Sequence, residues 1–121
     1  MVKNFENTGV GIDIVSVNRF RNKKYENNKS FYEKIYDKQE IEYCLKFKDP
    51  YTHFAGKFAI KEAVVKSISE KISFENIITS YEDSKPIVKL NSINLKNYNF
   101  LVSVSHENEF AIALVYSQNL K

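Results

Sequence analysis

Apolar and polar positions alternate along residues 9–17 (GVGIDIVSV), which is the period of a β-strand. The alternation gives two faces, with Val10, Ile12 and Ile14 on one and Gly11, Asp13 and Val15 on the other. Aspartate is disfavoured inside a strand. The pattern therefore indicates either a carboxylate displayed toward a ligand at Asp13, where Gly11 leaves room for close approach, or a strand that ends at Ile12 with Asp13 in a turn.

Residues 54–67 (FAGKFAIKEAVVKS) have apolar side chains nearly all the way round a helical wheel, and such a helix is normally buried. Four charged residues interrupt it: Lys57, Lys61, Glu62 and Lys66. Spacing alone favours an exposed Glu62–Lys66 ion pair contributing ~0.2–0.5 kcal/mol. The wheel places Glu62 between Phe58 and the small alanines instead, where a carboxylate needs a cation or hydrogen bonds.

Segments on either side of this helix predict the rest of the fold. Residues 30–47 have apolar positions suited to helical turns, with Asp37 or a neighbour as the cap of a new helix, and Asp49-Pro50 breaks that pattern. Residues 74–90 and 100–117 each predict an antiparallel hairpin, around EDSKP and HENE. We expect an α+β fold in one domain, residues 1–121, with helices packed on one side of a largely antiparallel sheet.

The last hairpin offers two faces that differ in size. We expect the bulky set to fill the core: Phe100, Val102, Val104, Phe110, Ile112 and Leu114. The opposite face then carries only small side chains: Ser103, Ser105, Ala111 and Ala113.

Composition narrows the class of protein. The chain has 121 residues, enough for one core, and a formal charge of +3 that favours anionic partners without the clustering expected of a nucleic-acid binder. A single cysteine, Cys44, excludes an internal disulfide and a cysteine-based zinc cluster. No signal-peptide or membrane-spanning stretch is evident, so we expect a cytoplasmic protein with no membrane and no nucleic-acid partner.

Two acids and a lysine suggest a magnesium site. Mg²⁺ is commonly held by one or two carboxylates together with substrate phosphates. Glu62 and Asp13 would supply the carboxylates, and Lys66, one helical turn after Glu62, would point at the same phosphates.

Two further groups carry candidate chemistry. Ser105 and His106 end a strand at a turn, where they would bind a phosphate or simply form a polar turn; a Ser/His nucleophilic pair is disfavoured because neighbours on a strand point to opposite faces. The only two arginines, Arg19 and Arg21, lie in a basic stretch that would dock an acidic protein or form a solvated loop.

Three motifs in this order resemble the holo-acyl-carrier-protein synthase family of 4′-phosphopantetheinyl transferases: GVGIDIVSV, FAGKFAIKEAVVKS and FLVSVSHENEFAIALV. The resemblance covers residues 9–116. It implies the fold of that family and Mg²⁺-dependent transfer of the phosphopantetheine arm of coenzyme A to a serine of apo acyl carrier protein, releasing adenosine 3′,5′-bisphosphate. It also implies a homotrimer with sites at subunit boundaries.

The resemblance implies a role for each candidate residue. Asp13 and Glu62 would bind the metal, and Lys66 would contact the diphosphate. Lys57, Ser105 and His106 would lie near the coenzyme A phosphates. Arg19 and its neighbour Arg21 would face the acidic carrier protein. The serine proton would pass to Glu62 directly or through a metal-bound water, and the sequence favours neither.

Three departures from the family pattern stand out. No glycine follows the central helix in ISEKISF, Lys57 occupies a position often held by arginine, and Ser84 stands where a glycine often precedes Lys-Pro. The missing glycine would change the loop that faces the phosphates, and lysine lacks the forked guanidinium that binds phosphate at two points. Both departures would weaken coenzyme A binding, whereas the third would change only a turn.

Two other functions fit parts of the pattern. A Mg²⁺-dependent nuclease or another phosphotransferase would also use Asp13 and Glu62, but nucleases commonly space an acid and a lysine by two on a strand, whereas KEAVVK has a helical four-residue offset. A non-catalytic module that binds an acidic carrier protein would not need Asp13, Glu62 and Lys66.

Overall fold

The computed structural model describes residues 6–92, 95 and 97–120. Five strands form two antiparallel sheets: β1 (Thr8–Ser16), β5 (Phe110–Asn119) and β4 (Tyr98–His106) in the order β1-β5-β4, and β2 (Ile77–Glu82) with β3 (Lys85–Leu90). The α-helices are α1 (Asn18–Arg21), α2 (Lys29–Glu33), α3 (Lys38–Leu45) and α4 (Pro50–Ser67), with short 3₁₀ turns at Tyr25–Asn27 and Phe74–Asn76. This confirms the predicted α+β class and both hairpins.

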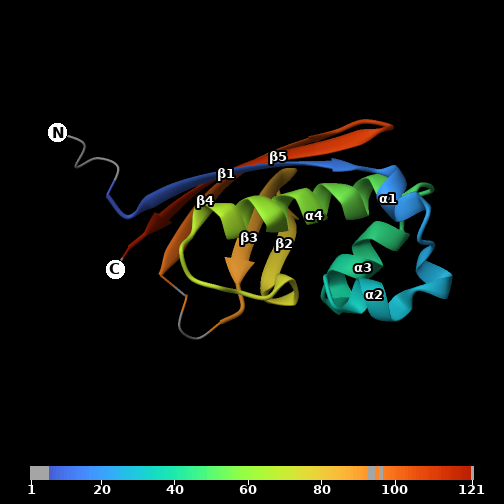
Figure 1. Cartoon of the computed structure of the whole chain (residues 1–121), viewed down its shortest axis with the longest axis horizontal. Helices are drawn as coiled ribbons and strands as arrows, with labels where there is room; N and C mark the ends of the chain where they lie inside the picture. Colours follow the sequence, from blue (N-terminus) through green and yellow to red (C-terminus); the bar gives the residue numbers. More distant parts are fainter. Residues whose placement is uncertain (1–5, 93–94, 96, 121) are drawn as a thin grey trace.

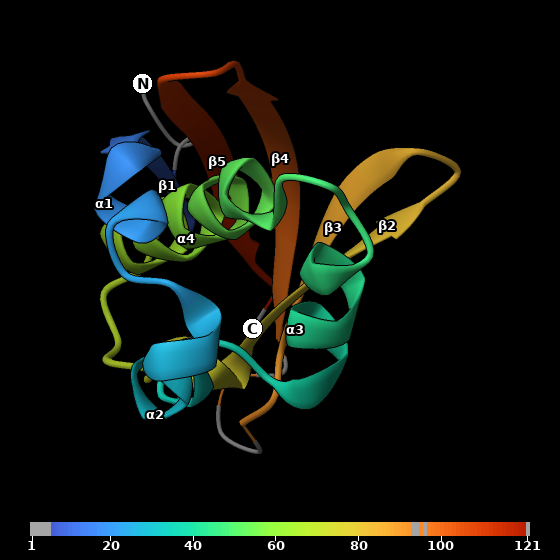
Figure 2. The same ribbon diagram turned by 90° about the vertical axis from the view of Figure 1, so that its right-hand side faces the viewer.

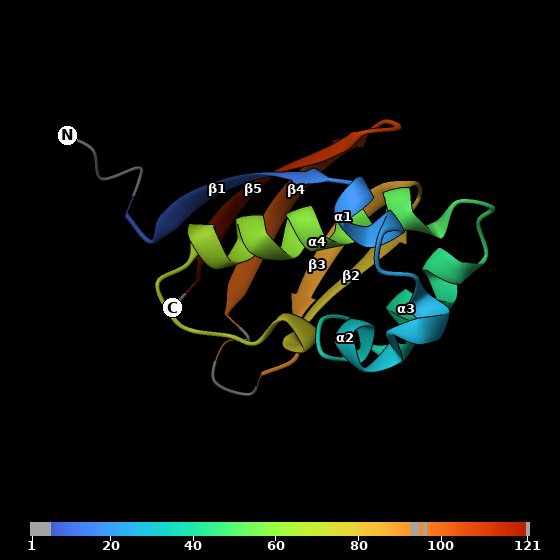
Figure 3. The ribbon, with the colours of Figure 1, turned by 45° about the vertical axis from the view of Figure 1, so that its right-hand side comes forward.

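Helix α4 lies along one face of the three-stranded sheet, and the other helices gather at one end on that same side (Figure 1). The β2–β3 hairpin stands beside β4 and contacts the opposite flank of α4 (Figure 2). The two sheets therefore curve around α4, with β1 on one flank of the helix and β2 on the other (Figure 3). Among the described residues, no helix is long and apolar enough to cross a membrane.

Helices α3 and α4 begin at residues whose side chains satisfy free backbone N–H groups. Asp37 caps α3 in a capping box, accepting from the Glu40 N–H at 2.8 Å while Glu40 accepts from the Asp37 N–H at 2.9 Å, as the sequence predicted. Asp49 caps α4 by accepting from the Tyr51 N–H at 3.1 Å, with Pro50 in the first helical position. The Asp49-Pro50 break is therefore the start of the central helix, four residues before Phe54.

Two glycines allow β1 to pack directly on α4. A Cβ atom on Gly9 would lie 1.8 Å from the carbonyl oxygen of Ser67, and one on Gly11 would lie 1.9 Å from that of Ala63. No side chain fits in such a space, since the obstacle is helical backbone. The close approach expected at Gly11 is that of the α4 backbone, which occupies the space where a ligand was expected.

The predicted core face of the last hairpin is wrong for β5. Val104 pairs with Ala113, and Val102 with Val115, so the inward face combines the bulky residues of β4 with Ala111, Ala113 and Val115. The remaining apolar residues of β5 are exposed on the outer face: Phe110, Ile112 and Leu114. Alanines face inward on β5 because α4 lies close over this strand. The three residues between β4 and β5 set a register in which the larger Val104 lies opposite the small Ala113.

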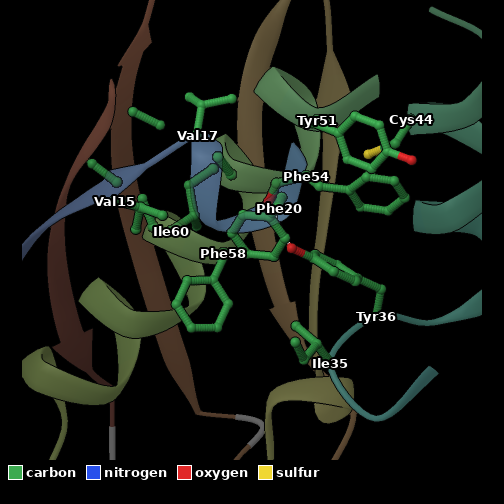
Figure 4. Packing of buried hydrophobic residues seen from close by; sticks show 14 of the residues in the cluster. Val15, Val17, Phe20, Ile35, Tyr36, Cys44, Tyr51, Phe54, Phe58 and Ile60 are labelled. Carbon is green, nitrogen blue, oxygen red and sulfur yellow. Dashed lines mark hydrogen bonds between the residues drawn. The ribbon is translucent and has the colours of Figure 1, made fainter. Parts of the chain in front are cut away.

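An aromatic cluster fills the space between α4 and the helices at its N-terminal end. Figure 4 shows Phe20, Phe54 and Phe58 packed together with Tyr36. The Tyr36 hydroxyl donates to the carbonyl oxygen of Phe54 at 2.6 Å, so its polar end is satisfied within the core. This packing fixes α4, from which three of the candidate site residues extend: Lys57, Glu62 and Lys66.

Candidate active site

The crossing of β1 over α4 brings two of the candidate residues, Asp13 and Lys66, into contact. Gly9 lies against Ser67 and Gly11 against Ala63, so β1 and α4 run in opposite directions. A step of two residues along the strand corresponds to about four residues along the helix. Asp13 is the next residue on the inward face of β1, and the same spacing leads us to expect it near the turn of α4 that carries Glu62. The Asp13 side chain is 16% exposed, and Glu62 is half-buried.

Lys66 joins this group directly. Its Nζ donates to Asp13 Oδ1 at 3.1 Å and to the carbonyl oxygen of Ile12 at 3.0 Å. The Lys66 side chain is 52% exposed, so the ammonium lies at the mouth of the site rather than in the core. Asp13 belongs to the regular strand, paired with Ala113, which excludes the alternative of a strand ending at Ile12.

Asp13 and Glu62 provide oxygen donors of the type that Mg²⁺ prefers. Among the described residues, no cluster of three or more His, Cys, Asp or Glu side chains could hold a metal ion. Two carboxylates on neighbouring elements nevertheless fit Mg²⁺, which retains waters and takes substrate phosphate oxygens for its remaining positions.

Lys57 lies on the other flank of α4. It is 3% exposed, and its Nζ donates to the Thr79 hydroxyl at 3.0 Å and the Thr79 carbonyl oxygen at 3.1 Å. The ammonium also lies 4.8 Å from the ring centre of Tyr43 and 5.3 Å from that of Tyr81. These residues line a cavity of about 450 Å³, and burial lowers the pKa of the Lys57 ammonium.

His106 also lies on this side, at the end of β4. Its ring centre is 5.2 Å from that of His53, which stacks on Phe47 with 3.6 Å between ring centres. A Cβ atom on Gly56 would lie 3.5 Å from His106 Cδ2, so the imidazole is close to α4. Burial, with smaller contributions from His106 and Lys57, lowers the pKa of His53.

Ser105 points away from α4. It pairs with Ile112 on the outer face of the sheet and is exposed there, whereas His106 pairs with Ala111 on the inner face. The two residues therefore lie on opposite faces, as strand geometry predicts. This arrangement excludes direct cooperation of the pair as nucleophile and base within one chain.

The structure thus separates the candidate residues into two groups on opposite flanks of α4. Lys66 reaches β1, whereas Lys57 reaches β2. Five residues separate Lys57 from Glu62, which turns their side chains about 140° apart on a helix. One chain alone presents the carboxylate group on one side and the Lys57–His106 group on the other.

Comparison with known proteins identifies the family. The model of the 4′-phosphopantetheinyl transferase superfamily matches residues 9–115. The chain belongs to this superfamily. The resemblance expected from its three motifs is therefore confirmed.

Individual relatives within the superfamily match nearly the whole chain. A holo-[acyl-carrier-protein] synthase of Thermodesulfovibrio yellowstonii is 37% identical over 111 residues, covering 88% of this chain and 95% of the relative. One from Halothermothrix orenii is 38% identical, covering 91% and 96%. The solved structure of the Helicobacter pylori holo-[acyl-carrier-protein] synthase in complex with coenzyme A has a TM-score of 0.74 and 33% identity, covering 88% and 96%.

Arg19 and Arg21, which we expect to face the acidic carrier protein, also make contacts within the chain. Arg21 binds Asp49 Oδ2 at 2.7 Å and the Asn108 carbonyl oxygen at 2.8 Å, and so links α1 to the start of α4 and to the β4–β5 turn. Arg19 is exposed, with its guanidinium carbon 4.8 Å from the ring centre of Phe58. Arg19 is therefore the more accessible of the two.

Sequence reasoning missed a buried ion pair beside the site. Lys61 and Glu40 have side chains that are 0% and 1% exposed, with Nζ 2.8 Å from Oε1. Lys61 also donates to the carbonyl oxygens of Phe74 and Ile77, and Glu40 accepts from Thr79. The sequence did mark Lys61 as unusual, because it is a charged residue in a helix that is apolar on nearly all sides. The one sequence signal for Glu40 was its position three residues after Asp37, the spacing of a capping box, which does not predict burial.

Proposed function

We propose that this chain is a holo-acyl-carrier-protein synthase of the cytoplasm. It transfers the 4′-phosphopantetheine group of coenzyme A to a serine hydroxyl of apo acyl carrier protein, releases adenosine 3′,5′-bisphosphate, requires Mg²⁺ and serves fatty acid biosynthesis. The observation that carries the proposal is the close crossing of β1 and α4, which brings Asp13 and Lys66 into contact in a chain of this superfamily. The similar protein of H. pylori binds coenzyme A, which supports the choice of donor.

Asp13 and Glu62 would hold the Mg²⁺ ion. When bound, this ion supplies positive charge that stabilises the negative charge developing on the phosphoryl oxygens. Oxygen-only donors from two elements support this assignment.

Lys66 would change partner during the reaction. Its ammonium now neutralises Asp13 across 3.1 Å. If Asp13 held the metal, the exposed side chain of Lys66 would instead be available to bind the diphosphate of coenzyme A. A cation at that position stabilises the charge that builds on the departing bisphosphate.

The bonds change at the β-phosphorus. The serine oxygen forms a new bond to that phosphorus, the bond to the bridging oxygen breaks, and the electron pair leaves with adenosine 3′,5′-bisphosphate. The serine proton passes to Glu62, directly or through an intervening water. Cys44 is not a nucleophile here, because burial raises the pKa of its thiol to about 12.

We further propose that the complete site forms in a homotrimer, between neighbouring subunits. Three observations support this. The carboxylate group and the Lys57–His106 group lie on opposite flanks of α4, and Ser105 lies on the outer face of the sheet. That face also exposes a contiguous set of apolar residues: Val10, Ile12, Ile14, Leu101, Phe110, Ile112 and Leu114. Such a patch marks an interface.

Lys57, Ser105 and His106 would bind the phosphates of coenzyme A at that boundary, and Arg19 and Arg21 would face the acidic carrier protein. The exposed guanidinium of Arg19 supports a docking role. The internal bonds of Arg21 support an additional part in holding α1 in place.

Intact-mass spectrometry tests the function. The purified protein is incubated with coenzyme A, Mg²⁺ and several apo carrier proteins, including that of its own genome. We expect one carrier to gain the mass of a single phosphopantetheine, and the gain to disappear with a chelator and return with excess Mg²⁺. No gain with any carrier would refute the proposed function.

A further inference from the structure

The hydroxyl of Thr79 lies between a buried carboxylate and a buried ammonium. Thr79 Oγ1 is 2.6 Å from Glu40 Oε2 and 3.0 Å from Lys57 Nζ. Both Thr79 and its two partners are almost completely buried. The three residues come from α3, α4 and β2, so this contact joins all three elements.

The direction of each hydrogen bond is determined by Glu40. Its Oε1 accepts from the Asp37 N–H at 2.9 Å and from Lys61 Nζ at 2.8 Å, and its Oε2 accepts from the Thr79 N–H at 2.7 Å. A carboxylate surrounded by donors acts only as an acceptor. The single proton of the Thr79 hydroxyl must therefore point to Glu40, which leaves the hydroxyl lone pairs for Lys57.

Lys57 is held in place by this arrangement. An ammonium has three N–H donors, and within the described residues Lys57 donates to Thr79 alone, through the hydroxyl and the carbonyl oxygen. One donor remains on a group that borders the 450 Å³ cavity with Tyr43, Tyr81 and Lys89. Acceptors on Thr79 also favour the charged lysine against the opposing effect of burial.

We propose that Thr79 is a positioning residue for coenzyme A binding: its hydroxyl, oriented by Glu40, fixes the Lys57 ammonium toward a phosphate in the adjoining cavity. This inference rests on the proposed function, in which Lys57 contacts a coenzyme A phosphate. The methyl group of Thr79 takes no part in this role, so the proposed effect comes from the hydroxyl alone.

Steady-state kinetics of Thr79→Val tests the role. We expect the KM for coenzyme A to rise about tenfold, the scale of one hydrogen bond to a charged group, while kcat stays within about twofold. Thr79→Ser retains the hydroxyl, so we expect its KM for coenzyme A to match that of the wild type. The matched control is Thr52→Val, which removes a hydroxyl from the first turn of α4, where it donates to the Asp49 carbonyl oxygen at 3.3 Å, and leaves KM unchanged.

A purely structural role predicts a different result. If Thr79→Val lowers the melting temperature but keeps the wild-type KM, or lowers kcat alone, or if Thr79→Ser behaves like Thr79→Val, the proposal is wrong. Should Thr79→Val not fold by circular dichroism, Thr79→Ala is judged by the same criteria. A wild-type protein without transferase activity would instead refute the proposed function, so the two failures are distinguishable.

Discussion

At the scale of single residues, the molecule places charge in its core only where the charged group has hydrogen-bond partners. Every buried side-chain nitrogen and oxygen atom among the described residues has a hydrogen-bond partner. Lys61 and Glu40 are the clearest case, because both are desolvated and each neutralises the other. Removing one charge therefore exposes the cost of burying the other.

Lys61→Met should lower the free energy of unfolding by about 3–5 kcal/mol, since Glu40 is left as an unpaired buried charge. Urea denaturation measures the loss. The exposed Lys71→Met is the matched control and should change stability by less than about 0.5 kcal/mol. Equal stability of the two variants would show that the ion pair contributes no net stabilisation.

His53 should make stability depend on pH. Burial lowers its folded-state pKa, so the unfolded chain binds the proton more readily. Stability is then highest above the unfolded-state pKa of about 6.5 and falls as pH decreases through that value toward the folded-state pKa. His53→Gln should flatten the slope just below the unfolded-state pKa of about 6.5 in thermal melts. An unchanged slope in the variant would contradict this assignment.

The sequence predicted some residue roles better than others. Asp13 and Lys66 were foreseeable because an acid in a strand and a lysine on a buried helix each conflict with their local setting, and the structure brings them together. Glu40 and Thr79 were not, because ordinary residues in an amphipathic helix and a strand carry no local conflict. Their importance arises only when α3, α4 and β2 pack together. The catalytic roles remain predictions.

At the scale of elements, the hairpins were predictable and one of their faces was not. Turn residues and alternation predicted both hairpins, although residues 74–76 form a 3₁₀ turn before β2 and only Asp83 and Ser84 of the predicted EDSKP turn lie between the strands. The inward face of β5 depends on how closely α4 approaches, which favours alanine over leucine. Bulk alone therefore selected the wrong face at Phe110, Ile112 and Leu114.

The β2–β3 turn contains a strained serine. Asp83 and Ser84 have φ angles of 52° and 68°, both in the left-handed region, as a two-residue hairpin turn requires. Glycine adopts this region without the roughly 1–2 kcal/mol cost of a Cβ atom. Ser84→Gly should stabilise the protein by about 1 kcal/mol in urea denaturation. Ser80→Gly, in the regular part of β2, should destabilise it, and the same sign for both variants would rule out the turn-strain explanation.

At the scale of the whole molecule, one large surface lacks a covering layer among the described residues. Helices pack on one face of the three-stranded sheet (Figure 1), and the exposed apolar side chains of β1, β4 and β5 lie on the opposite face. A contiguous apolar face of this kind favours association. It also offers a physical reason for the exposed, outward apolar residues of β5.

Leu114→Glu should disrupt the proposed homotrimer. Leu114 lies on the central strand and pairs with Ile12 and Ser103, so a charge there would be buried in the interface without a partner. Sedimentation equilibrium should show a trimer for the wild type and a monomer for the variant. Leu45→Glu, at an exposed leucine of α3, is the matched control and should remain trimeric. A trimeric Leu114→Glu protein would place the interface elsewhere.

The central claim is that Asp13 and Glu62 together hold one Mg²⁺ ion beside the diphosphate of coenzyme A. The most direct measurement is the rate of phosphopantetheine transfer, followed by intact mass across a Mg²⁺ titration, for Asp13→Asn, Glu62→Gln and the exposed control Glu42→Gln. We predict that both site variants stay folded and lose about a hundredfold or more in rate at every Mg²⁺ concentration, while the control matches the wild type. Wild-type rates and Mg²⁺ dependence in either site variant would contradict the account.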